Sequence, residues 1–262
     1  MYQNRPNQNY NYGQPHQAYP QQQPYAPYGQ PMQGAYHGDG DGQFVEGAEA
    51  GDISHPAVAA FTRKVYTYFA TALATAAAAA FGTTKLAEQF IAQQNTGALS
   101  GLWIGGTITF FVSYLIVVFT RKNHSPFKTA LLYVFAGAAG AMLSPLLMAY
   151  VSAGMGMVIV LAFGVATITF LGLTVFTLTT GKDFRSLGGM LLIGVLTVLG
   201  LAIVNIFMQV SVLTTILMGL GLLVFIGFTL YDTSRVVRDY YFANDAVSAA
   251  INLLYDFVML FR

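Results

Sequence analysis

The chain has 262 residues, of which 55% are hydrophobic and only 9% are charged, and its formal net charge is +1. A soluble domain usually carries about 25% charged residues because its surface must be wetted, so we expect most of this surface to face lipid. The near-zero net charge gives no electrostatic reason for a nucleic-acid partner, and the absence of cysteine excludes disulfides, thiol catalysis and thiolate metal sites.

The N-terminal segment differs in composition from the rest of the chain. Residues 1–55 are rich in Gln, Tyr, Pro and Gly and contain six of the nine prolines. Such a segment cannot bury enough apolar surface to offset the entropy of ordering it. We therefore expect a disordered cytoplasmic tail over residues 1–55, which could also associate with itself or capture a partner, and a membrane domain over residues 56–262.

Seven apolar runs follow the tail. A helix needs about 20 apolar residues to cross the hydrocarbon core, and the first six runs meet this requirement, whereas the seventh is shorter. The sequence therefore predicts an all-α integral membrane protein with seven transmembrane helices. The runs cover residues 65–83, 102–119, 129–149, 157–180, 187–208, 212–231 and 246–261.

Small and polar residues inside these runs indicate how the helices pack. The alanine patch Ala76–Ala80 in the first run and Gly140 in the third allow close approach of helices in lipid. Pro145, which follows Ser144, removes a backbone hydrogen bond and predicts a kink or a break in the third helix. Asn205 in the fifth run is expected to find a polar partner on another helix.

The distribution of basic residues predicts the orientation in the membrane. Only Lys85 and Arg262 lie on the side opposite the tail. Cytoplasmic loops carry the excess of Lys and Arg, so we expect a multi-pass protein of the cell inner membrane with a cytoplasmic N-terminus. The residues on the tail side are Arg63, Lys64, Arg121, Lys122, Lys128, Lys182, Arg185, Arg235 and Arg238.

Two acidic residues fall in apolar runs. Asp256 lies ten residues into the seventh run, about 15 Å along a helix, where a lone carboxylate costs at least ~2.5 kcal/mol. Asp232 closes the sixth run. Because a short loop joins the sixth and seventh helices, we expect them to pack side by side and antiparallel, which would bring the two carboxyl groups together. Four other acids are expected in solvated loops: Glu88, Asp183, Asp239 and Asp245.

The acid pair has two interpretations. Asp232 and Asp256 could hold a closed state by sharing a proton, and on losing it they would repel each other or accept a cation such as calcium, which prefers oxygen ligands. This would be a pH-sensitive gate and a tentative calcium site. Alternatively, Asp232 could form an ion pair with Arg235, three residues further on, while Asp256 stays protonated and bonded to a neighbouring helix.

Four sequence segments carry a family resemblance. They are Tyr231-Asp232-Thr233, the segment Leu254–Phe261, Arg63-Lys64-Val65-Tyr66 and Thr180-Gly181-Lys182-Asp183-Phe184. In this order and spacing the chain, over about residues 60 to 261, resembles the bacterial branch of the Bax inhibitor (transmembrane Bax-inhibitor-motif) family.

The resemblance implies a fold and a function. The implied fold is a central C-terminal helix surrounded by six others, and the implied activity is a cation leak, mainly for calcium, with Asp232 and Asp256 as the pH sensor. A basic residue at the end of the second helix latches one aspartate in such proteins, and Arg121 or Lys122 occupies that region, with Arg235 as a third candidate latch. The run 102–119 contains no acid, unlike the second helix of some members.

The sequence therefore leaves two functions to compare. The first is a pH-sensitive calcium leak channel, and the alternative is a non-conducting regulator of another membrane protein such as a protease. An enzyme is not expected, because neither aspartate lies in a Gly-x-Gly-Asp motif and no His-Glu-x-x-His motif is present. The expected partners are the lipid bilayer, calcium or other cations and, for the regulator, another membrane protein. No cofactor is expected, since calcium would be a transported ion.

Overall fold

A computed structural model of the chain describes residues 53–119, 126–241 and 243–262. These residues form helices α1 (Pro56–Ala92), α2 (Thr96–Phe119), α3 (Pro126–Ser152), α4 (Gly156–Thr180), α5 (Gly188–Met208), α6 (Ser211–Arg235) and α7 (Ala246–Phe261). A short 3₁₀ helix, η1 (Phe184–Leu187), precedes α5, and a π-helical turn, η2 (Val236–Tyr240), follows α6. The expected tail falls almost wholly outside the described residues.

The helix lengths agree with a multi-pass membrane protein. Six helices are long and apolar enough to cross a membrane, whereas α7 has 16 residues. At 1.5 Å per residue α7 spans about 24 Å, which is less than the roughly 30 Å of the hydrocarbon core. The described part of the chain thus contains six full-length candidates and a shorter seventh helix.

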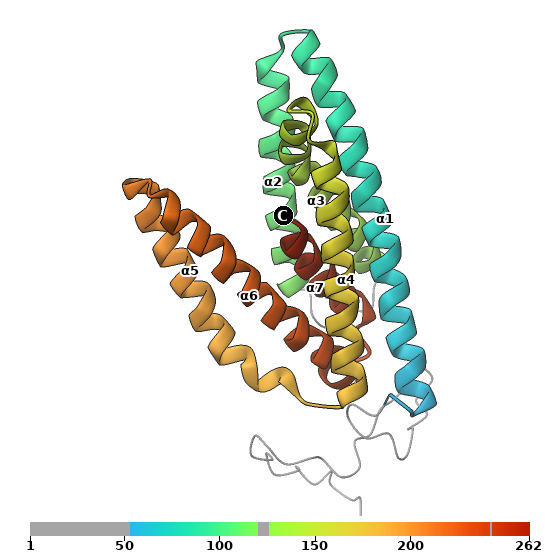
Figure 1. Cartoon of the computed structure of the whole chain (residues 1–262). Coiled ribbons are helices and arrows are strands. Elements are labelled where there is room, and N and C mark those ends of the chain that lie inside the picture. Colours follow the sequence, from blue (N-terminus) through green and yellow to red (C-terminus); the bar gives the residue numbers. More distant parts are fainter. Residues whose placement is uncertain (1–52, 120–125, 242) are drawn as a thin grey trace, which may run out of the picture. The chain divides into compact units, whose positions relative to one another are not determined.

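Helix α7 lies among the other helices. It packs against α1, α2, α3, α4 and α6 (Figure 1), and its apolar side chains Ile251, Leu253 and Leu254 are fully buried. Helix α5 instead packs on α6 and η1 and presents a row of large apolar side chains outward. The expectation of six helices around α7 thus corresponds to five direct neighbours, with α5 behind α6.

The contact between α1 and α3 depends on a glycine. A Cβ atom at Gly140 would lie 2.1 Å from the carbonyl oxygen of Ala76 and 2.7 Å from the backbone nitrogen of Ala80. The two backbones therefore meet directly, as the small residues in both sequence runs predict.

Of the kink or break expected at Pro145, the break is absent from α3. The helix is continuous from Pro126 to Ser152. Pro145 has no N–H to donate to the carbonyl of Ala141, but the Ser144 hydroxyl donates to that same oxygen at 2.9 Å. The freed acceptor is satisfied within the helix, which is the condition for retaining a proline in a membrane span.

The turn between α5 and α6 carries the expected interhelical hydrogen bond. Asn205 Nδ2 donates to Thr214 Oγ1 at 2.7 Å, and Asn205 Oδ1 accepts from the backbone N–H of Val210 at 3.1 Å. The prediction that Asn205 has a polar partner on another helix is confirmed.

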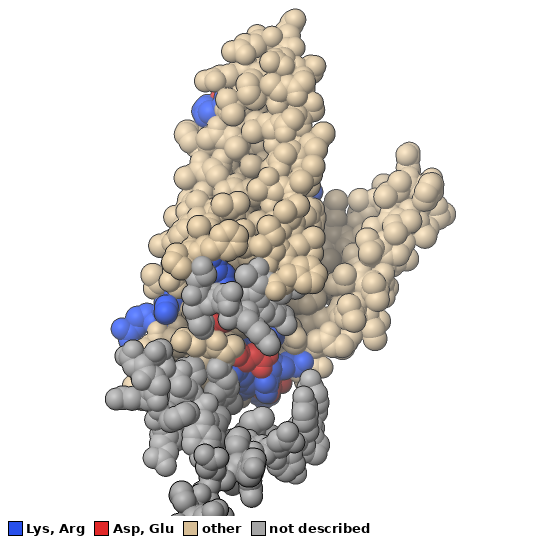
Figure 2. Space-filling view, turned by 180° about the vertical axis from the view of Figure 1, so that it is seen from behind, with Lys and Arg blue, Asp and Glu red and all other residues tan. Residues whose placement is uncertain are grey.

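Charged side chains gather at one end of the described helices. Figure 2 shows most of the Lys, Arg, Asp and Glu atoms of this face at the lower end, below a long surface with few charged residues. This end, which we call the arginine-rich end, contains Arg185, Arg235 and Arg238. The ion pair between Lys85 and Glu88 lies near the end of α1, far along that helix from Pro56.

Candidate functional site

Asp256 is buried inside the helical bundle. It lies on α7 eleven residues after Asp245, the residue that precedes this helix, and only 1% of its surface is exposed. Its Oδ2 atom has no hydrogen-bond partner among residues 53–119, 126–241 and 243–262. A buried carboxyl oxygen without a partner is costly, which sets Asp256 apart from the acids that have ion-pair partners.

Asp232 lies on α6 near its end and is also buried, with 8% of its surface exposed. The two carboxyl groups are near enough to interact electrostatically. Arg235 Nη1 lies 3.2 Å from Asp232 Oδ1, which makes the i, i+3 ion pair. Asp232 is therefore paired with Arg235, as the second interpretation of the sequence expected, and also lies within electrostatic range of Asp256.

Aromatic rings surround this acid pair. Tyr114 of α2 stacks on Tyr255 of α7 with ring centroids 5.3 Å apart, and Phe110 and Phe225 pack on Tyr255 at 6.1 and 6.2 Å. Tyr114 lies close enough to interact electrostatically with Asp232 and Asp256. Both acids are buried, so any charge here acts in a medium of low dielectric constant.

Arg235 is shared between two acids and two rings. Besides Asp232, it contacts Asp239 through Nε at 3.0 Å, and its guanidinium lies 5.3 Å from the ring centre of Tyr231 and 4.8 Å from that of Tyr240. Arginine suits this role because its planar group forms ion pairs and stacks on rings. The other two latch candidates, Arg121 and Lys122, lie outside the described residues.

A row of ion pairs connects the acid pair with the protein surface. Arg185 contacts both Asp183 and Asp239 at 2.7 Å, and Asp239 in turn contacts Arg235, which contacts Asp232. The hydrogen bonds from Arg185 hold the pKa of Asp183 at about 2, below its ordinary value of 3.8. Exposure of the side chains falls from 43% at Asp183 to 11% at Asp232, so the row runs inward.

The loop after α4 is fastened to the end of α6 by further hydrogen bonds. Arg238 Nη2 donates to the carbonyl of Gly181 at 2.8 Å, and the backbone N–H of Phe184 donates to Ser234 Oγ at 3.1 Å. Gly181 ends α4 with a φ of 62°, a left-handed conformation that glycine adopts without strain. These contacts fix the position of Asp183 and Arg185 relative to α6.

Asp245 was expected in a solvated loop, and this expectation is wrong. Its side chain is 7% exposed and contacts Lys128 Nζ of α3 at 2.5 Å, while its Oδ1 accepts from the backbone N–H of Ser248 at 3.1 Å. Asp245 is thus the N-cap of α7 and half of a buried ion pair. The sequence carried a signal for the cap, because an aspartate stands immediately before an apolar run. It carried none for the ion pair, because Lys128 is 117 positions away.

The acid pair by itself is a small set of metal ligands. Within the described ranges no group of three or more His, Cys, Asp or Glu side chains is arranged to hold a metal ion. Calcium takes six to eight oxygen ligands, so Asp232 and Asp256 would have to be supplemented by backbone carbonyls or water.

Comparisons with known proteins agree with this architecture. The family described as "Inhibitor of apoptosis-promoting Bax1" matches residues 58–262. An uncharacterized protein of Campylobacter jejuni, Cj0236c, is 31% identical over 204 residues, which cover 77% of this chain and 84% of that protein. Protein RP147 of Rickettsia prowazekii is 30% identical over 212 residues, which cover 76% of this chain and 84% of that protein.

A shorter match is to a protein whose role is named. The "Modulator of FtsH protease YccA" of Escherichia coli K12 is 34% identical over 135 residues, which cover 51% of this chain and 62% of YccA. The same match is found with the "Inner membrane protein YccA" of a second Escherichia coli strain.

Proposed function

Since the chain belongs to the Bax inhibitor family, we propose that it is a pH-sensitive cation leak, with calcium as the transported ion, gated by Asp232 and Asp256. One observation carries this proposal. Asp256 is buried and its Oδ2 has no partner in the described chain, yet a second acid lies within electrostatic range. An arrangement that costs free energy in the folded protein is a candidate for function rather than for stability.

In the proposed closed state Asp256 carries a proton. A neutral carboxyl group is tolerated among the rings of Tyr114 and Tyr255, and Asp232 keeps its charge because Arg235 neutralises it. The bundle then encloses no uncompensated charge along α7.

In the proposed open state Asp256 has lost its proton. A second negative charge near Asp232 is repelled strongly, because the surroundings exclude water. The repulsion is relieved when the site admits water and a cation or when α6 and α7 separate. Calcium is favoured because it is doubly charged and binds carboxylate oxygens. The chain acts in this proposal without catalysis and without a cofactor.

We also propose that the arginine-rich end faces the cytoplasm. Its exposed basic residues follow the excess of Lys and Arg on that side of membrane proteins. The row from Arg185 to Asp232 would then expose the gate to the pH of the cytoplasm.

The test is calcium flux into liposomes that contain the purified full chain, measured from about pH 5 to 8. Wild-type flux should change with pH, and Asp256→Asn and Asp232→Asn should each abolish or displace that change. Asp183→Asn is the matched control, because a group with a pKa of about 2 is ionised throughout this range and contributes no transition there.

Two results would overturn the leak. One is flux at background level from correctly folded wild-type protein at every pH. The other is an unaltered pH profile in both aspartate variants, provided that gel filtration shows them to be as monodisperse as wild type.

A second candidate function is regulation of a membrane protease. It is supported by the similarity to YccA, whose name describes a modulator of the FtsH protease. The protein would then bind an FtsH-type protease through its helices or through residues 1–55, and ion flux would be secondary.

Co-purification with FtsH discriminates the two functions. If the chain is a regulator that binds through its tail, deletion of residues 1–55 should reduce the amount of FtsH recovered and leave liposome flux unchanged. Asp256→Asn should do the reverse. Failure of the full chain to recover FtsH, with its flux intact, would exclude the regulator.

A further inference from the structure

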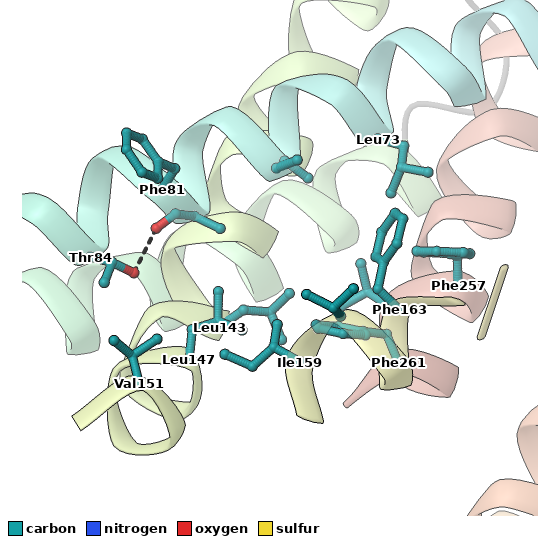
Figure 3. A pocket seen from close by; sticks show the side chains of 15 residues that line it. Leu73, Phe81, Thr84, Leu143, Leu147, Val151, Ile159, Phe163, Phe257 and Phe261 are labelled. Carbon is teal, nitrogen blue, oxygen red and sulfur yellow. Dashed lines mark hydrogen bonds between the residues drawn. The ribbon is translucent and has the colours of Figure 1, made fainter. Parts of the chain in front are cut away.

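An apolar cavity of about 400 Å³ lies beside the C-terminal half of α7. Figure 3 shows its walls, to which α1 contributes Leu73 and α3 contributes Leu147, while α4 contributes Phe163 and α7 contributes Phe257 and Phe261. It begins one residue beyond Asp256 and extends away from the arginine-rich end. The acid pair and its aromatic neighbours Tyr114 and Tyr255 do not line it, so it is distinct from the candidate gate.

The lining offers no polar group to a ligand. Thr84 carries the hydroxyl drawn in Figure 3, and this hydroxyl donates to the carbonyl of Ala80 at 2.8 Å within α1. Water needs two to four polar partners to occupy a buried cavity, and an apolar cavity of this size stays dry and takes up apolar molecules. The chemistry of the lining therefore selects an alkyl or aryl ligand.

The position of the cavity selects among apolar ligands. It lies between helices long and apolar enough to span the membrane, and Phe163 and Val160 of its wall are 42% and 63% exposed on the surface that would face lipid. The hydrocarbon core that would surround these helices presents alkyl chains to this surface.

We propose that this cavity binds one acyl chain of a membrane lipid. The chain lies against Phe163, Phe257 and Phe261 and supplies the dispersion contacts that the cavity walls lack. It thereby supports the last turns of α7, which pack against α1, α3 and α4. The acyl chain is thus a structural ligand that holds the C-terminal end of α7 against α1, α3 and α4.

The test compares two alanine substitutions on α1. Ala77 lines the cavity and is exposed, so Ala77→Phe fills the cavity from one wall without disturbing the Gly140 contact. Ala74 is also exposed but does not line the cavity, which makes Ala74→Phe the matched control. The full chain in mild detergent is mixed with palmitoyl-oleoyl-phosphatidylethanolamine, and retained lipid is counted by native mass spectrometry after detergent exchange.

We expect wild type and Ala74→Phe to retain one lipid that Ala77→Phe loses. The added lipid should raise the melting temperature of the first two proteins and leave that of Ala77→Phe unchanged. In lipid-free detergent Ala77→Phe should melt no lower than wild type, because the new ring occupies the cavity; this separates displacement of the lipid from misfolding.

Three outcomes would overturn the proposal. Ala77→Phe could retain the lipid as wild type does, or none of the three proteins could retain any. A wild-type dimer that Ala77→Phe dissociates would instead assign the cavity to a second copy of the chain.

Discussion

The two acids of the candidate gate differ in the partners that the surrounding side chains give them. Asp232 has a cationic partner in Arg235, which is itself held by Asp239 and by the ring of Tyr240. Asp256 has an oxygen without a partner in the described chain. Position along α7 made Asp256 conspicuous in the sequence, because a carboxyl group in an apolar run is costly wherever the helix packs. Arg235 forms its two ion pairs at i, i+3 and i, i+4 spacing, and the spacing to Asp232 had indicated the first of them.

Adding one methyl group at Gly140 tests the contact between α1 and α3. Gly140→Ala places a methyl group 2.1 Å from the carbonyl oxygen of Ala76, so the helices must separate, at a cost of about 1–3 kcal/mol. Gly137→Ala is the control, because a Cβ there meets nothing within 4 Å. Thermal unfolding in detergent should show a lower melting temperature for Gly140→Ala alone; equal melting temperatures would contradict the close approach.

At the scale of elements, α7 is held at its start by polar contacts and along its length by apolar ones. Asp245 caps the helix and pairs with Lys128 of α3, and Asn252 donates to the hydroxyl of Tyr240 in η2 at 2.5 Å. From Leu253 to Phe261 the side chains of α7 are apolar or aromatic, apart from Asp256.

The buried ion pair gives a prediction at this scale. Lys128→Met leaves Asp245 charged and uncompensated, which should cost about 3–5 kcal/mol. In Lys128→Met/Asp245→Asn the asparagine still caps α7 and no buried charge is left alone, so most of the stability should return.

The control for this pair is Lys85→Met, which removes an exposed ion pair with Glu88 and should cost at most about 1 kcal/mol. All variants can be compared by thermal unfolding in detergent. A double variant no more stable than Lys128→Met would show that the ion pair is not the source of the loss.

At the scale of the whole molecule, charge is distributed unevenly between the two ends of the helices. The row from Asp183 through Arg185 and Asp239 to Arg235 lies between the end of α4 and the end of α6, whereas the far end of α1 carries Lys85 and Glu88. Between them the surface is apolar, as lipid contact requires. This asymmetry is the physical basis for the proposed orientation.

The orientation can be tested directly because the chain has no cysteine. Gln93→Cys in the turn after α1 should react with a membrane-impermeant maleimide in spheroplasts, in which the outer membrane is removed and the inner membrane is intact. Lys182→Cys in the loop after α4 should react only after the inner membrane is permeabilised. Both positions are exposed, so the reverse pattern would place the arginine-rich end outside.

The sequence by itself determined the class of protein, the places of the helices, and the two acids that warrant attention. These follow from local chemistry: backbone groups in lipid must be satisfied within each helix, and an ionisable side chain in an apolar run is costly in any fold. Only the tertiary structure decided that Asp245 is buried against Lys128, that α5 packs behind α6, and that an apolar cavity adjoins the end of α7. Each of these depends on which helices become neighbours, and in lipid that choice rests on close packing between distant segments, which no local pattern of apolar residues specifies.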